Sequence, residues 1–97
     1  MTLNQAKNRF ELLTDGKLSI VEFIQHGPQT LALTHTEVHP DLEGQGIGSR
    51  LVKSVLEYLE QHNLKMLPYC PFVEAYVRRH PEWNRLLSDD YYPSEEF

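Results

Sequence analysis

The sequence has a single cysteine, Cys70, and no apolar run that approaches the roughly 20 residues needed to cross a bilayer. One cysteine cannot form an intrachain disulfide, so nothing in the sulfur content requires an oxidising compartment. The N-terminus also lacks the basic and then apolar layout of a secretion signal. We therefore expect a cytoplasmic protein with no membrane partner.

Basic residues are scarce as well, with 9 Lys and Arg against 14 Asp and Glu, which gives a net charge of −5. No stripe of Lys and Arg with interleaved aromatics is present, which argues against nucleic acid as a partner. The 97 residues, 40% of them hydrophobic, predict one domain over residues 1–87 and an acidic, disordered tail over 88–97. Because so small a domain buries little surface, a homodimer is one way to add burial.

Residues 9–13 and 18–25 alternate or concentrate apolar side chains in the manner of half-buried strands. Asp15-Gly16 between them favours a tight hairpin turn with positive φ at both positions. Residues 1–7 are polar, and we expect them to fray.

A third strand is predicted over residues 30–38, after a break at Gly27-Pro28. Together the three runs predict an antiparallel meander. Regular alternation would place four side chains on one face of the third strand: Leu31, Leu33, His35 and Glu37.

From Ile47 the apolar residues follow helical spacing, which predicts a helix that ends near His62-Asn63. Residues 64–69 then favour a strand parallel to the third one, because a crossover helix separates the two. A second helix is expected between Pro71 and Pro81, with Trp83 and the residues after it packing back. The predicted fold class is therefore α/β (α+β): a three-stranded meander followed by helix, strand and helix.

A glycine-punctuated segment, Glu43-Gly44-Gln45-Gly46-Ile47-Gly48, joins the third strand to the first helix. Such a segment directs backbone N–H groups and the positive end of the helix dipole at one point, which can bind an anion without basic side chains. A loop that only needs flexible turns remains the alternative. The segment is not a P-loop, because Ser49-Arg50 follows Gly48, and it lacks the third glycine of a dinucleotide fingerprint.

The segment resembles the acyl-CoA pyrophosphate loop of the GNAT acetyltransferase superfamily, together with His35-Thr36-Glu37-Val38 before it and Pro68-Tyr69-Cys70-Pro71-Phe72-Val73 after it. More narrowly, the chain looks like the very small, single-domain, uncharacterised N-acetyltransferase-like proteins of that superfamily. The resemblance implies acetyl-CoA as acyl donor, an unidentified amine as acceptor, and an N-acetyltransferase activity. It implies cofactor contacts from Val38, Glu43, Gly44, Gln45, Gly46, Ile47, Gly48, Ser49 and Cys70.

Two features depart from the superfamily pattern. Glu43 stands where most members carry Arg or Gln, so a carboxylate would face the pyrophosphate unless it points away. Only the Asp15-Gly16 turn stands where the usual domain has helices that build the acceptor site. An alternative function is therefore a CoA-binding or protein-interaction module without turnover.

Acyl transfer to an amine needs a base, an oxyanion donor and an acid for the leaving thiolate. Glu37, at the end of the strand before the loop, is the candidate base, although a solvated carboxylate is equally expected there. By resemblance, the N–H of Val38 would donate to the acetyl oxygen. Tyr76 would protonate the thiolate, unless it is only part of the core.

Cys70 lies between a predicted strand end and a helix N-terminus, where the dipole favours a thiolate. It could form an acetyl-cysteine, lie beside CoA, or be a small buried apolar residue. The 3′-phosphate of CoA could be reached by four basic residues, unless these only form solvated helix faces: Arg50, Lys53, Arg78 and Arg79. No metal is expected, because His35 and His39 would lie about 13 Å apart along an extended strand.

Overall fold

Five strands form one sheet in the computed structural model, which describes residues 1–91. They lie in chain order across the sheet, from β1 to β5. β1 to β4 are antiparallel neighbours, and β5 is parallel to β4, so the predicted α+β fold class is confirmed. The strands are β1 (Thr2–Asn4), β2 (Arg9–Thr14), β3 (Lys17–Gln25), β4 (Thr30–Glu37) and β5 (Lys65–Pro68).

The predicted fraying of residues 1–7 is wrong, because β1 pairs with β2 and places Thr2 opposite Glu11. A short 3-10 helix, η1 (Gln5–Lys7), follows β1, and the Asn4 side chain accepts a hydrogen bond from the Lys7 N–H. The Asn4 amide also donates to the Glu11 carboxylate, at 3.0 Å. These side-chain bonds hold a segment that has too few apolar residues to show strand alternation.

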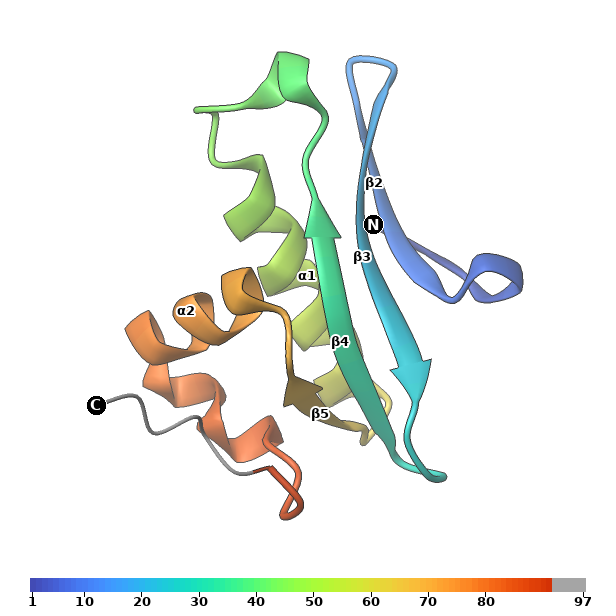
Figure 1. Cartoon of the computed structure of the whole chain (residues 1–97), viewed down its shortest axis with the longest axis vertical. Helices are drawn as coiled ribbons and strands as arrows, with labels where there is room; N and C mark the ends of the chain where they lie inside the picture. The colour runs from blue at the N-terminus through green and yellow to red at the C-terminus, as the bar shows by residue number, and fades with distance from the viewer. Residues whose placement is uncertain (92–97) are drawn as a thin grey trace.

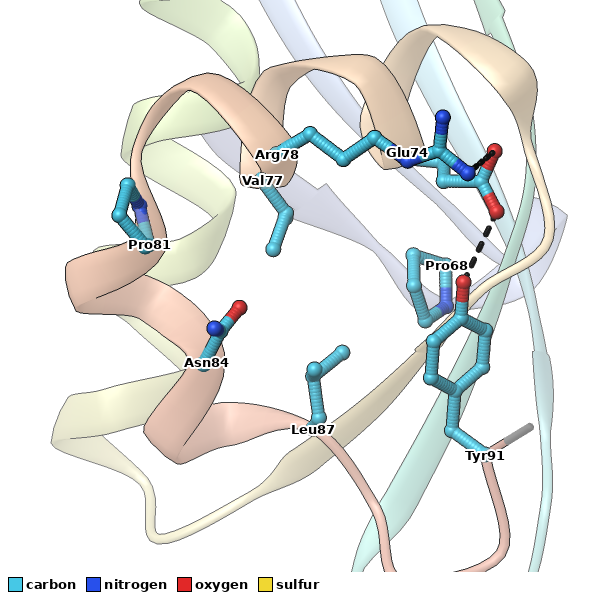
Figure 2. Close-up of a pocket in the computed structure, with 8 residues that line it drawn as sticks. All are labelled: Pro68, Glu74, Val77, Arg78, Pro81, Asn84, Leu87 and Tyr91. Carbon is cyan, nitrogen blue, oxygen red and sulfur yellow. Dashed lines mark hydrogen bonds and ion pairs between the residues drawn. The ribbon is translucent and has the colours of Figure 1, made fainter. Parts of the chain in front are cut away.

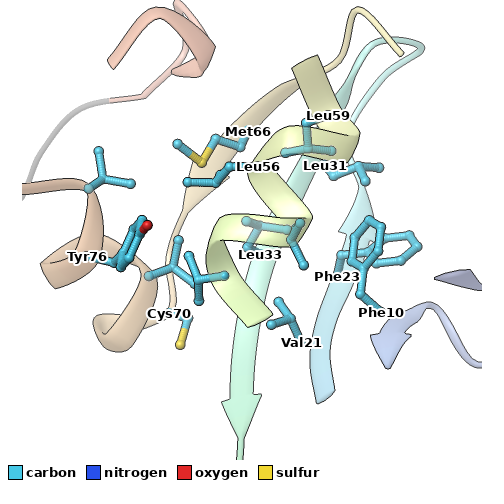
Figure 3. Packing of buried hydrophobic residues seen from close by; sticks show 14 of the residues in the cluster. Phe10, Val21, Phe23, Leu31, Leu33, Leu56, Leu59, Met66, Cys70 and Tyr76 are labelled. Atoms are coloured by element: carbon cyan, nitrogen blue, oxygen red, sulfur yellow. The ribbon is translucent and has the colours of Figure 1, made fainter. Parts of the chain in front are cut away.

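Both α-helices pack into one hydrophobic cluster with the same face of the sheet (Figures 1 and 3). They are α1 (Ile47–Gln61) and α2 (Pro71–Arg79), and α1 is followed by Asn63 with φ of 55°, the left-handed exit predicted for it. Neither helix of residues 1–91 is long and apolar enough to span a bilayer. The side chains buried most completely in the cluster are Phe10, Val21, Leu33, Leu51, Val52, Leu56, Leu59, Met66 and Val73.

β4 contains an extra residue relative to β3. Phe23 lies opposite Leu33 but Glu22 lies opposite His35, so Thr34 is a β-bulge. A shift of one residue exchanges the two faces of a strand. The single face predicted for residues 31–37 is therefore wrong beyond the bulge.

Beyond the bulge it is Thr36 that shares the helix-covered face, opposite the buried Val21. Glu37 lies opposite Ile20 on the other face of the sheet. Thus Leu31 and Leu33 belong to the core, whereas Glu37 does not share their face.

The chain after α2 forms a 3-10 helix, η3 (Pro81–Leu86), and returns along β5. Trp83 and Leu86 are buried as expected, and the Ser88 N–H donates to the Met66 carbonyl at 2.9 Å. The Tyr91 hydroxyl donates to the Glu74 carboxylate at 2.9 Å (Figure 2). Ser88 and Tyr91 thus contact the domain, and residues 92–97 of the tail expected to be disordered lie outside the described residues.

Burial raises the pKa of Tyr91 to about 12, and the hydrogen bond to Glu74 and the charge of Glu74 act in the same direction. Since this pKa lies above the ordinary value of 10.0, the neutral phenol stabilises the fold fully below pH 10. That stability is lost as the pH rises toward 12. We expect Tyr91→Phe to lose less unfolding free energy than the wild type over this interval, in urea titrations at a series of pH values. Tyr69→Phe, at an exposed tyrosine, is the control, and equal losses in wild type and Tyr91→Phe would contradict the assignment.

Candidate functional site

The segment between β4 and α1 is anchored at its start. The His39 N–H donates to the hydroxyl of Ser19 at 3.3 Å, and Ser19 is completely buried on β3. A 3-10 helix, η2 (Pro40–Leu42), follows. Its N-cap is His39, whose Nδ1 accepts a hydrogen bond from the Asp41 N–H. Leu42 is buried at the end of η2. The glycines that follow therefore start from a fixed position.

Gly44 and Gly46 have φ of 80° and 72°, a left-handed conformation that L side chains adopt only with strain. Gly46 is the N-cap of α1, and no side chain caps the helix. The first turn of α1 also contains no acidic residue. Its free N–H groups and the helix dipole thus favour an anion at this end of the helix.

The loop, the first turn of α1 and one residue of α2 surround a cavity of about 310 Å³. Seven of the residues predicted to contact the cofactor line it, and Gln45 and Cys70 do not. Glu43, one of the seven, is exposed at this site. The cavity is lined by Val38, Leu42, Glu43, Gly44, Gly46, Ile47, Gly48, Ser49 and Phe72.

Phe72 reaches this cavity because residue 48 is a glycine. A Cβ at Gly48 would lie 2.6 Å from Cζ of Phe72, closer than real Cβ contacts allow. The Phe72 ring is 39% exposed although it is large and apolar. The first turns of α1 and α2 thus contact each other through the backbone of Gly48 and the ring of Phe72.

A second cavity, of about 350 Å³, adjoins the first at Ser49 and lies between α1 and α2. Arg50 and Lys53 contribute positive charge, and Tyr76 contributes a phenol whose ring lies 4.3 Å from that of His80. Burial raises the pKa of Tyr76, and the charge of Glu82 raises it further, so the phenol keeps its proton at neutral pH. The two cavities together suit an elongated ligand with anionic groups.

Cys70 is the N-cap of α2 and lies where β5 separates from β4. Its thiol is 4% exposed and donates to Oγ1 of Thr36 at 3.3 Å. Its N–H donates to the Leu33 carbonyl at 2.8 Å. Cys70 is therefore packed between β4 and α2.

Glu37 is separated from the other predicted catalytic residues by the strand that carries it. Its side chain is 69% exposed on the face away from the helices, with Oε2 at 3.4 Å from Nε2 of His35. The next residue, Val38, lines the loop cavity. Glu37, Cys70 and Tyr76 do not form one hydrogen-bonded cluster, because Glu37 contacts His35, Cys70 contacts Thr36, and Tyr76 lines the second cavity.

Phe72, Thr36 and Ser19 are site residues that sequence reasoning missed. The helical pattern predicts Phe72 only as an apolar residue of the second helix. Regular strand alternation predicts Thr36 on the face away from Leu33. Their roles arise from contacts with residues far along the chain, for which the local pattern carries no signal.

Two further observations concern metal binding and the other cavities of the structure. Within residues 1–91, no group of three or more His, Cys, Asp or Glu side chains is arranged to hold a metal ion. A cavity of about 360 Å³ lies on the other side of α2, beside Tyr91 (Figure 2). Arg78 lines it, but none of the predicted catalytic residues and none of the predicted loop residues does.

Known proteins resemble this chain over most of its length. The family model described as GCN5-related N-acetyl-transferase matches residues 9–86. Protein NATD1 of Xenopus tropicalis and of Homo sapiens are each 30% identical over 67 residues, or 69% of this chain, and the match spans 60% and 58% of their lengths. A solution NMR structure of a GCN5-like protein from Staphylococcus aureus superposes with a TM-score of 0.69 and 25% identity, over 97% of this chain and 90% of the other.

The contact between Gly48 and Phe72 predicts a coupling between the two positions. Gly48→Ala should gain helix propensity of about 0.5 to 1 kcal/mol, but in the wild type the clash with the ring should offset this gain. In a Phe72→Ala background the same change should be stabilising by about that amount. Urea unfolding of the four proteins of this cycle measures the difference. The same effect of Gly48→Ala in both backgrounds would contradict the contact.

Proposed function

Because the chain belongs to the GCN5-related N-acetyltransferase family, we propose that it transfers the acetyl group of acetyl-CoA to an amine of another molecule. The observation that carries this proposal is the uncapped N-terminus of α1, preceded by left-handed glycines and bordered by two cavities. Both cavities are large enough for parts of a small-molecule ligand. The proposed setting is the cytoplasm, where acetyl-CoA is available.

The donor is proposed to lie along α1 and α2. The N–H groups from Gly44 to Ser49 would hold the pyrophosphate, since Glu43 offers it no positive charge. Arg50 and Lys53 line the adjoining cavity and would face the 3′-phosphate of CoA. Phe72 would cover the donor at the loop, because its exposed ring borders the loop cavity.

The transfer itself needs three groups of this chain. Glu37 would accept the proton that the attacking ammonium loses, and its exposure leaves it open to an amine from solvent. The Val38 N–H would donate to the acetyl oxygen as the new C–N bond forms and the C–S bond breaks. Tyr76, which stays protonated at neutral pH, would give its proton to the leaving thiolate.

A second candidate function is a CoA-binding module without turnover. One observation favours it: Glu37 and Tyr76 lie on opposite sides of β4, and Tyr76 shares its cavity with the cationic side chains. Binding of CoA with no thiol release above background, over a broad screen of amines, would support this alternative.

We expect isothermal titration to detect acetyl-CoA binding, and Gly46→Ala to weaken it by at least about tenfold. The added Cβ strains a residue with φ of 72° and occupies the approach to the helix N-terminus. Gly27→Ala is the matched control, because Gly27 has φ of 77°, equally open surroundings and a place in the distant β3–β4 turn. If both variants bind as the wild type does, the loop is not the donor site.

Cys70 is not expected to form an acyl intermediate, because its thiol is buried, hydrogen-bonded to Thr36 and lines neither of the two proposed donor cavities. Wild-type protein incubated with acetyl-CoA and no acceptor should keep its unmodified mass in intact mass spectrometry. Cys70→Ser should retain most of the turnover measured by thiol release. An acetyl adduct on the wild type that is absent from Cys70→Ala would instead establish a covalent step.

A further inference from the structure

The face of the sheet away from the helices is here called the open face (Figure 1). It carries exposed apolar side chains. Leu13 is 68%, Ile24 62% and Leu18 37% exposed, and Leu13 lies directly opposite Leu18. Single exposed apolar residues are ordinary, but these lie on one face of two adjacent strands. On β2, β3 and β4 the open face comprises Arg9, Glu11, Leu13, Leu18, Ile20, Glu22, Ile24, Ala32, His35 and Glu37.

Carboxylates interrupt the apolar side chains of the open face. Arg9 pairs with Glu11 at 2.7 Å, and Oε2 of Glu37 lies 3.4 Å from Nε2 of His35, but within residues 1–91 neither Glu22 nor Glu37 forms an ion pair with Lys or Arg. Glu22 lies opposite Arg9 and His35, and Glu37 lies opposite Ile20, so the two carboxylates lie close together on the neighbouring strands β3 and β4, and the three carboxylates of the face outnumber its one arginine. The face is thus both apolar and negatively charged.

This combination decides between the possible occupants. A second copy packed on the same face would bring carboxylates toward carboxylates and bury charges without partners, which is costly. A positively charged partner with apolar side chains would pair with the carboxylates and cover the apolar residues. The net charge of −5 also attracts such a partner.

We propose that the acceptor is a positively charged peptide segment that docks on the open face and presents a lysine amine to Glu37. This inference rests on the proposed function. Glu37 ends β4, and Val38 beside it lines the loop cavity. A segment on the open face therefore leads to the site of acetyl transfer. β3 has 9 residues, or about 30 Å at roughly 3.3 Å per residue, which suits a peptide better than a single small amine.

Docking is measured without acetyl-CoA, by fluorescence anisotropy of a labelled peptide of alternating lysine and leucine. Glu22→Gln should raise its Kd by up to about fivefold, the range of one exposed ion pair. Ile24→Lys should also raise it, because it adds a positive charge to the face. Glu57→Gln, which removes an exposed carboxylate from α1, is the charge-matched control and should leave the Kd unchanged. Binding should weaken with added salt.

Acetyl-CoA titrations on the same proteins keep the two proposals separate. Donor binding by all variants, with peptide affinity unaffected by Glu22→Gln and Ile24→Lys, would overturn this inference and leave the proposed function intact. Absence of donor binding in the wild type would overturn the proposed function. Equal acetylation of a free small amine and of the peptide, or a dimer that Ile24→Lys dissociates in sedimentation, would also overturn the inference.

Discussion

The bulge at Thr34 controls the geometry of everything near the site. Before it, Leu33 anchors β4 in the core, and after it Thr36 takes the same face and meets the Cys70 thiol. The same shift turns Glu37 outward, and Val38 then enters the loop cavity. One unpaired residue in one strand thus divides the helix-covered face, the donor side of our proposal, from the open face, its acceptor side.

The donor side is built mainly from backbone. Left-handed Gly44 and Gly46 leave the α1 N-terminus free of side chains, and the buried Ser19 hydroxyl fixes the start of the loop. The missing Cβ of Gly48 then lets Phe72 close the cavity from α2. An acidic protein can in this way form an anion site, because the helix dipole and free N–H groups replace basic side chains.

The acceptor side follows from the shortness of the chain between β2 and β3. Asp15 and Gly16, with φ of 51° and 75°, make a hairpin turn in place of any covering helix. The face beneath stays open, with apolar side chains beside carboxylates that outnumber the single arginine. A partner must supply the wall that the domain lacks.

Local patterns were sufficient for the Asp15-Gly16 turn, the span of α1, its left-handed exit at Asn63 and the glycine loop, because each depends on neighbouring residues alone. By itself, the sequence therefore determined the order of the elements from β2 to α2 and the position of the glycine loop between β4 and α1. The bulge, the strand at Thr2–Asn4 and the contact between Gly48 and Phe72 were decided only by the tertiary structure. The reason is physical: strand register and helix packing are set by residues far apart in the chain, and a shift of one position exchanges the faces of a strand.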